Sequence, residues 1–200
     1  MRFDNKKVLV TGASRGIGRA VARQFASAGA QVAVHCRANQ EAARDTLASL
    51  DGTGHVLCAG DLADAPTVQR IVTEVITSLG GLDILVNNAG IFEAHPIDEV
   101  SFAKWQTAWQ RTLAVNLTGP ANLCWCAVEH MREHGGGRIV NVSSRGAFRG
   151  EPRCPAYGAS KAGLNAMTQS LAQHVAGLGI FVGAVAPGFV ETDMAKTTLQ

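Results

Sequence analysis

Short apolar runs alternate with longer amphipathic stretches along almost the whole of this 200-residue chain. Runs this apolar are typical of strands in a parallel sheet that helices cover on both faces. Right-handed crossovers between such strands build a doubly wound sheet. We therefore expect one α/β domain over residues 1–200, with a single doubly wound parallel sheet between two helical layers. The expected strands are 7–10, 31–35, 55–57, 82–86, 138–142 and 180–186, and the expected helices are 17–28, 40–50, 66–79, 102–113, 119–134 and 156–175.

The composition argues against several classes of protein. Hydrophobic residues make up 46% of the chain and charged residues 17%, so a core can form and disorder is disfavoured. The 18 basic and 16 acidic side chains leave a net charge of +2, which gives no general attraction to nucleic acid or to an anionic membrane. No apolar run reaches the about 18 residues of a membrane span, and the first residues lack a secretory-signal pattern.

The five cysteines are an odd number with no framework spacing. Such cysteines are typical of reduced thiols in a reducing compartment, and we expect a cytoplasmic protein. Cys124 and Cys126 form a C-x-C pair, but they fall in a helical pattern without a second pair of ligands. The sequence therefore predicts no metal site.

A glycine-rich turn, Thr11-Gly12-Ala13-Ser14-Arg15-Gly16-Ile17-Gly18, follows the first expected strand and opens the first expected helix. Gly12 suits a tight turn, Gly16 lets backbone approach a diphosphate, and Gly18 lets the helix pack closely on the sheet. The free N–H groups and the dipole of the helix start favour phosphate. The spacing differs from the common G-x-G-x-x-G, yet the strand–turn–helix context predicts a Rossmann-like nucleotide site. A purely structural turn is the alternative.

The end of the second strand bears on the choice of nucleotide. NAD-binding proteins usually place an acid there for the ribose hydroxyls, whereas this chain has His35-Cys36-Arg37. Arg37, together with Arg15, could face a 2′-phosphate, while Glu41 falls within the next helix pattern and is expected to be solvated. We therefore predict NADP rather than NAD, the alternative being that Arg37 is an ordinary surface residue.

Tyr157, the only tyrosine, stands four residues before Lys161 in a helical pattern, so both side chains can point into one cleft. A free phenol has a pKa of about 10, and the nearby ammonium together with the positive nicotinamide ring of the cofactor is expected to lower it. Ser143 and Ser144 end the preceding strand, where a hydroxyl could bind a substrate oxygen. No histidine or aspartate is placed to make either serine a nucleophile, which disfavours a hydrolase.

Together these residues resemble the short-chain dehydrogenase/reductase family in its compact one-domain form, and within it the 3-oxoacyl-acyl-carrier-protein reductases. Ser144 stands thirteen residues before Tyr157, which selects it over Ser143. The matching elements run in family order: Thr11-Gly-x-x-x-Gly16-x-Gly18, Asp61, Asn87-Asn88-Ala89-Gly90, Asn116, Ser144, Tyr157-x-x-x-Lys161 and Pro187-Gly188-x-Val190-x-Thr192.

The resemblance implies a role for each of four catalytic residues. Tyr157 donates the proton in reduction and accepts it in oxidation, Lys161 lowers the pKa of Tyr157 and holds the nicotinamide ribose, and Ser144 polarises the carbonyl. Asn116 holds a water that links Lys161 to solvent; without the resemblance it reads as a cap or kink between two helices. The implied cofactor contacts are Gly12, Ser14, Arg15, Gly16, Ile17, Gly18, Arg37, Asp61, Leu62, Asn88, Ala89, Gly90, Tyr157, Lys161, Pro187, Gly188, Val190 and Thr192.

The resemblance also implies an activity: transfer of hydride between NADP(H) and a small-molecule carbonyl or secondary alcohol, such as a 3-oxoacyl thioester, by a homodimer or homotetramer. One alternative is a non-catalytic NADP-binding module or redox sensor, which would not need Ser144, Tyr157 and Lys161 together. Another is a sugar-nucleotide epimerase or dehydratase, which generally needs a larger C-terminal domain.

Two regions depart from the family pattern or leave it open. Family members usually continue beyond the length of this chain, so we expect a truncated C-terminus that lacks the last strand and leaves the sheet edge less stable. The segment after Ser144 carries Arg145, Arg149 and Arg153. These arginines could attract an acidic substrate or carrier protein, or they could form a solvated loop.

Overall fold

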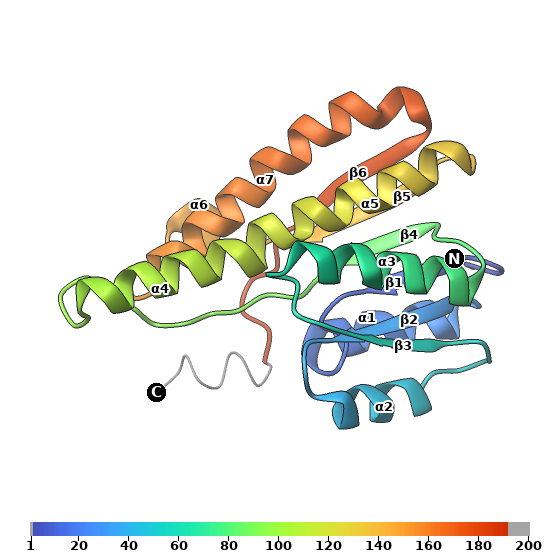
Figure 1. Cartoon of the computed structure of the whole chain (residues 1–200), viewed down its shortest axis with the longest axis horizontal. Helices are drawn as coiled ribbons and strands as arrows, with labels where there is room; N and C mark the ends of the chain where they lie inside the picture. The colour runs from blue at the N-terminus through green and yellow to red at the C-terminus, as the bar shows by residue number, and fades with distance from the viewer. Residues whose placement is uncertain (1, 192–200) are drawn as a thin grey trace.

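The computed structural model describes residues 2–191 (Figure 1). Its strands are β1 (Lys7–Val10), β2 (Gln31–Cys36), β3 (Val56–Ala59), β4 (Ile84–Asn87), β5 (Gly137–Val142) and β6 (Ile180–Val185). Its helices are α1 (Gly16–Ser27), α2 (Gln40–Ala48), α3 (Ala65–Leu79), α4 (Phe102–Leu113), α5 (Gly119–Glu133), α6 (Gly146–Arg149) and α7 (Pro155–Val175), with a π-helical turn η1 (Ala114–Thr118) and a 3₁₀ turn η2 (Ala176–Leu178).

All six strands lie parallel in one sheet with the order β3-β2-β1-β4-β5-β6. In β1, Val8 stands opposite Val32 of β2 on one side and Ile84 of β4 on the other. The strand order reverses between β1 and β4, and ligands of such sheets bind at the carboxyl ends of the strands near that point. The predicted doubly wound parallel sheet is therefore confirmed.

Two layers of helices cover the two faces of the sheet (Figure 1). Leu9, Leu85 and Ile139 project into a core beneath α3, α5 and α7. Val8 and Val10 project into a second core beneath α1 and α2. Because side chains alternate along a strand, neighbouring residues of β1 enter different cores. This three-layer arrangement holds the strand ends, and the loops that follow them, along one edge.

Helices α1 and α2 do not cover the whole of their face of the sheet. On β6, Ile180 faces the α7 side and is 0% exposed, whereas its neighbour Phe181 is 60% exposed and Val185 is 50% exposed. The Arg138 guanidinium lies 4.6 Å from the centre of the Phe181 ring and shields some of it. Within residues 2–191, β6 is one of the two edge strands of the sheet, and β3 is the other.

The helices α4 and α5 differ most from the prediction, because η1 joins them into one continuous rod (Figure 1). The sequence predicted a break between 113 and 119. Pro120 lies in the first turn of α5 and has no N–H to donate to the carbonyl of Asn116, its α-helical partner. The chain accommodates this with a wider turn rather than by ending the helix.

In the described part of the chain, no helix is both long and apolar enough to cross a membrane. All five cysteines fall within it, and none is joined in a disulfide. Residues 2–191 also contain no group of three or more histidine, cysteine or acidic side chains arranged to hold a metal ion.

Candidate active site

The loops that follow the six strands surround one cleft of about 540 Å³. The structure places most of the predicted site residues on its walls. Asn116 is buried behind the cleft, and Thr192 lies outside the described residues. The predicted residues that line the cleft are Gly12, Ser14, Arg15, Gly16, Ile17, Gly18, Arg37, Asp61, Leu62, Asn88, Ala89, Gly90, Ser144, Tyr157, Lys161, Pro187, Gly188 and Val190.

The glycine turn after β1 is packed tightly against the loop after β4. Gly12 has a φ of +63°, in the left-handed region that favours glycine, and a Cβ at Gly18 would collide with the Gly12 carbonyl. The Thr11 hydroxyl accepts the N–H groups of Asn88 and Ala89, both at 3.0 Å. In return, the Asn88 amide donates to the Thr11 carbonyl at 2.8 Å. These bonds fix the two loops side by side.

The start of α1 is open, unlike the starts of three other helices. Asn39, Asp64 and Ser101 cap α2, α3 and α4 by accepting a backbone N–H, whereas Arg15 gives α1 no side-chain cap. The first turn of α1 also holds no acidic residue. Among residues 2–191, no side chain caps the N–H groups of this turn, and they and the positive dipole end line the cleft. This donor set fits the diphosphate of a dinucleotide.

His35 supports this turn, a role that the sequence did not reveal. The N–H of Gly12 donates to His35 Nδ1 at 3.2 Å, and His35 Nε2 lies 3.1 Å from the Gly60 carbonyl. Burial lowers the pKa of His35 to about 4, so the ring is neutral near pH 7. A neutral ring that accepts at Nδ1 carries its proton on Nε2 and donates it to Gly60. His35 thus links the turn after β1 to the loop after β3.

Asp61 and Arg37 line the part of the cleft next to β2 and β3. The Asp61 carboxylate accepts the Ala63 N–H at 3.0 Å and the Arg111 guanidinium at 3.1 Å. Burial alone would raise the pKa of Asp61, but these two donors and the charge of Arg37 outweigh burial and lower it. Asp61 is therefore a carboxylate at neutral pH, and it ties the cleft to α4.

Lys161 is buried beside Tyr157 on α7. Its Nζ donates to the Val142 carbonyl at 2.8 Å and lies 5.8 Å from the centre of the Tyr157 ring. Lys161 is 4% exposed, and burial lowers its pKa to about 8. The ammonium is thus still the main form at pH 7, held between β5 and the phenol.

The phenol of Tyr157 is partly buried, and its ring packs edge-on against Phe92 at 4.8 Å between ring centres. Burial raises its pKa above 10, while the Ser144 side chain acts in the opposite direction. Burial thus outweighs the other influences on the phenol in this chain, because it desolvates the phenolate, while the Lys161 ammonium is directed at the Val142 carbonyl. The lowering expected from Lys161 together with a nicotinamide ring stays a prediction.

The two serines at the end of β5 have different partners. Ser143 is buried and its hydroxyl donates to the Lys161 carbonyl at 3.4 Å. Ser144 Oγ accepts the N–H of Gly146 at 3.1 Å, which leaves the hydroxyl proton of Ser144 available toward the cleft. This arrangement agrees with the selection of Ser144 over Ser143.

Asn116 lies in the π-helical turn and positions the loop after β4. Its Oδ1 accepts the Ile91 N–H at 2.8 Å, and its Nδ2 donates to the Ile91 carbonyl at 3.0 Å and to Ser160 at 3.2 Å. A Cβ added to Gly90 would come within 3.3 Å of Asn116 Oδ1 and 3.6 Å of Lys161 Nζ. The side-chain amide is thus used by the chain itself, and the expected water-holding role of Asn116 stays a prediction.

Two further residues near the site had no sequence signal. His95 is fully buried; its Nε2 accepts the Ala156 N–H at 3.2 Å, and its Nδ1 lies 2.8 Å from the Glu93 carbonyl. It therefore supports the first turn of α7, one residue before Tyr157. Glu151 lines the cleft beside the catalytic candidates. Neither residue belongs to a motif, and only the folded chain brings them to the site.

The three arginines after β5 separate in the structure. Arg153 forms a two-pronged ion pair with Glu99, at 2.8 and 2.9 Å. Arg145 lines the cleft, whereas Arg149 is exposed outside it. Only Arg145 therefore stands where it could meet a substrate bound in the cleft.

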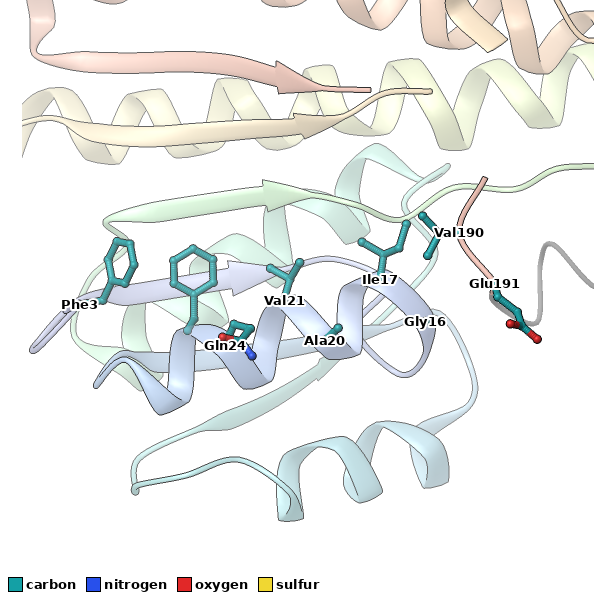
Figure 2. A pocket seen from close by; sticks show the side chains of 9 residues that line it. Phe3, Gly16, Ile17, Ala20, Val21, Gln24, Val190 and Glu191 are labelled. Atoms are coloured by element: carbon teal, nitrogen blue, oxygen red, sulfur yellow. The ribbon is translucent and has the colours of Figure 1, made fainter. Parts of the chain in front are cut away.

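A second hollow of about 590 Å³ runs along α1 (Figure 2). Figure 2 shows Phe3, Val21 and Ile17 along it, with Val190 beside Ile17. Of the described residues on its wall, Gln24 and Glu191 alone have polar side chains, and none is a predicted catalytic residue. We therefore place the reaction in the cleft at the strand ends rather than in this slightly larger apolar hollow.

Comparison with known proteins agrees with this geometry. The profile of the family described as short chain dehydrogenase matches residues 6–200. A sorbitol dehydrogenase from Cereibacter sphaeroides is 38% identical over 192 residues, which are 96% of this chain and 73% of that protein. A 3-oxoacyl-acyl-carrier-protein reductase from Staphylococcus aureus is 38% identical over 191 residues, which are 94% of this chain and 76% of that protein.

A solved structure shares both the fold and much of the sequence. It is a short chain dehydrogenase from Burkholderia cenocepacia in complex with NADP, with a TM-score of 0.87 and 39% identity. The match covers 97% of this chain and 78% of that one. This chain thus spans about three quarters of the length of the proteins compared.

Proposed function

Because the chain belongs to the short-chain dehydrogenase/reductase family of oxidoreductases, we propose that it transfers hydride between NADP(H) and a carbonyl or secondary alcohol. One observation carries this proposal: Ser144, Tyr157 and Lys161 line the same cleft as the open start of α1. A nucleotide-binding module or redox sensor would not need this acid–base group next to the nucleotide site.

The residues of the cleft fit a dinucleotide. The N–H groups at the start of α1 would bind the diphosphate, and Gly90 leaves room above Lys161 and Asn116 for the nicotinamide ribose. Arg37 on the wall, with Arg15 nearby, supports NADP, because both can pair with a 2′-phosphate and no acid ends β2. The NADP complex of the Burkholderia cenocepacia relative supports the same choice.

When bound, the cofactor supplies or accepts the hydride. The chain supplies the proton and the position. In reduction, Tyr157 donates its phenolic proton to the carbonyl oxygen, and Ser144 donates a hydrogen bond to the same oxygen. The raised pKa of Tyr157 keeps the phenol protonated, as an acid must be before the reaction. The Lys161 ammonium then stabilises the phenolate that forms.

Substrate and assembly are narrower proposals. The relatives include a protein named for a polyol and one named for a 3-oxoacyl thioester, so the family covers both classes of substrate. We keep a small-molecule carbonyl or alcohol as the substrate. A homodimer or homotetramer in the cytoplasm stays a prediction; Trp125, exposed on α5, is consistent with contact between subunits.

The test is NADPH oxidation by wild type and Tyr157→Phe against a panel of ketones, aldehydes and acyl thioesters. We expect wild type to prefer NADPH over NADH in kcat/KM, and Tyr157→Phe to lose at least about 100-fold in kcat. NADPH binding, measured by fluorescence titration, should change little, because the diphosphate and ribose contacts remain. Turnover that survives in the variant would assign the proton to another group, and a preference for NADH would reverse the cofactor assignment.

A further inference from the structure

One acidic side chain in the cleft has no part in the chemistry proposed above. Glu151 lies in the loop between α6 and α7 and lines the cleft together with Ser144, Arg145 and Tyr157. It is partly buried, and its negative charge contributes to the raised pKa of Tyr157. The Glu151 side chain thus lines the same cleft as the phenol.

The backbone holds Glu151 in this place. Its carbonyl accepts the Cys154 N–H at 2.9 Å, which closes a turn just before α7. Its side chain lies over Gly146, where an added Cβ would come within 2.9 Å of both Cγ and Oε1 of Glu151. The lack of a side chain at Gly146 thus makes room for the carboxylate beside the strand end that carries Ser144.

Within residues 2–191, no side chain or backbone group donates a hydrogen bond to the Glu151 carboxylate, and no cation pairs with it. Arg149 and Arg153 are equally near to Glu151 in sequence. Arg153 is engaged by Glu99, and Arg149 is exposed and does not line the cleft. Arg145 lines the same cleft but forms no ion pair within these residues. A carboxylate that is partly withdrawn from water is stabilised when a ligand brings it a hydrogen-bond donor.

The position of the reacting carbonyl determines which part of a substrate can bring a hydrogen-bond donor to Glu151. Ser144 and Tyr157 mark the place of the carbonyl oxygen in the proposed reaction. Glu151 lines the same cleft and packs against Gly146, whose N–H donates to Ser144 Oγ at 3.1 Å. A group on the carbon next to the carbonyl would therefore be near Glu151. A hydroxyl there can donate to the carboxylate, an alkyl group cannot, and a negatively charged group is repelled.

We propose that Glu151 is a specificity-determining residue that selects substrates with a hydroxyl next to the reacting carbon, namely hydroxyketones and the corresponding polyols. This inference rests on the proposed hydride transfer and narrows its substrate. It makes a plain ketone or an anionic keto compound the poorer substrate.

The test uses pairs of ketones that differ only by a hydroxyl in place of a methyl group: hydroxyacetone with butanone, and hydroxycyclohexanone with methylcyclohexanone. For each pair, the ratio of kcat/KM values is measured with NADPH for wild type, Glu151→Gln and Glu151→Ala. Glu133→Gln, at the exposed end of α5, is the control for loss of one negative charge. Acetoacetate serves as the anionic substrate.

We expect wild type to favour the hydroxyketone of each pair. In Glu151→Ala that preference should fall about tenfold, which corresponds to the loss of one hydrogen bond to a charged group. Glu151→Gln should keep part of the preference and gain activity on acetoacetate relative to butanone, because it keeps an acceptor without the charge. Glu133→Gln should resemble wild type, and circular dichroism would verify that every variant is folded.

Equal use of both members of each pair by wild type, or a preference unchanged in both Glu151 variants, would overturn the assignment while leaving hydride transfer in place. Failure of wild type to reduce any carbonyl with either cofactor would instead overturn the proposed function and this inference with it. The two failures are thus distinguished by the activity of wild type on the plain ketones.

Discussion

Lys161 carries a buried positive charge that lowers the stability of the fold and stands next to the proposed proton donor. Its ammonium is 4% exposed and, within residues 2–191, donates one hydrogen bond, to the Val142 carbonyl. Burial disfavours its charged form, which is why its pKa falls from 10.5 to about 8. A residue that merely filled space in this position would be apolar. Its presence therefore points to a use for positive charge beside the phenol.

We predict that Lys161→Met stabilises the chain below pH 8 and that the gain disappears in alkaline solution. The folded chain binds its Lys161 proton more weakly than the unfolded chain, so wild type recovers stability as pH rises from about 8 to about 10.5. The depressed pKa corresponds to about 3 kcal/mol, and the difference in unfolding free energy between Met variant and wild type should shrink by that order. Urea denaturation at several pH values measures it.

Lys104→Met, on the exposed surface of α4, is the matched control and should show no such trend. A difference between Lys161→Met and wild type that stays constant from pH 7 to 10.5 would contradict the folded-state pKa on which the prediction depends.

At this scale the sequence predicted which residues meet, but not what they do to one another. The order and spacing of Ser144, Tyr157 and Lys161 predicted that they meet, and the structure has all three lining one cleft. The direction of the Tyr157 pKa depends on burial, which the Ser144 side chain opposes, and burial cannot be read from a motif. In the sequence, His35 mattered only because it stands where an NAD-binding protein usually has an acid. Its hydrogen bond with the Gly12 N–H could not be predicted, because that bond forms only in the folded turn.

Among the elements, α7 depends on a residue far away in sequence. Its N-cap residue, Cys154, offers no side-chain bond, and His95 accepts the Ala156 N–H in its place. His95 also packs against Trp105 of α4, with 5.5 Å between ring centres. One imidazole thus holds the start of α7 against the loop after β4, next to the position of Tyr157.

We predict that His95→Leu lowers the free energy of unfolding by about 1–3 kcal/mol, because it leaves a buried N–H without an acceptor. His95→Gln should recover part of the loss, since its amide oxygen can accept the same bond. Chemical denaturation measures both variants. His174→Leu, an exposed histidine of the same helix, should change stability little. Equal effects at both positions would show that the bond to Ala156 contributes nothing.

The helices and strands themselves were largely predictable, because their apolar periodicity is strong and glycine or proline separates them. The boundaries differ by one or two residues, as fraying ends usually do. Three short elements were not predicted: α6, the 3₁₀ turn η2 and the π-helical turn η1. Of these, η1 changes the architecture most. A gap in the pattern before Gly119-Pro120 predicted two helices, whereas the structure widens one turn and keeps the rod intact. Proline removes one hydrogen bond, and the neighbouring helices decide whether the rod bends, widens or ends.

For the molecule as a whole, the sheet is covered unequally on its two faces. Helices α3, α5 and α7 cover one face from β3 to β6, whereas α1 and α2 leave the other face of β6 exposed. The alternating pattern predicted the sheet and its two layers. The pattern could not predict which part of a face lacks a helix. An apolar strand has the same kind of sequence whether helices cover both of its faces or one.

We predict that neighbouring substitutions on β6 differ sharply in effect. Ile180→Ala should cost about 2–5 kcal/mol of unfolding free energy, because Ile180 is fully buried beneath α7. Phe181→Ala should cost less than about 1 kcal/mol, because its ring faces solvent and contacts the Arg138 guanidinium. Denaturation of residues 1–200 measures both. A costly Phe181→Ala would mean that another surface covers this face in solution.

The sequence holds a single tyrosine, and the fold puts that ring in the cleft. Ultraviolet difference absorption of the phenolate therefore comes from one position, without any label. Since burial raises the pKa of Tyr157, the phenolate absorption should appear only in alkaline solution. A cation bound beside the ring would lower the pH at which this absorption appears. The group proposed to deliver the proton is thus its own optical indicator.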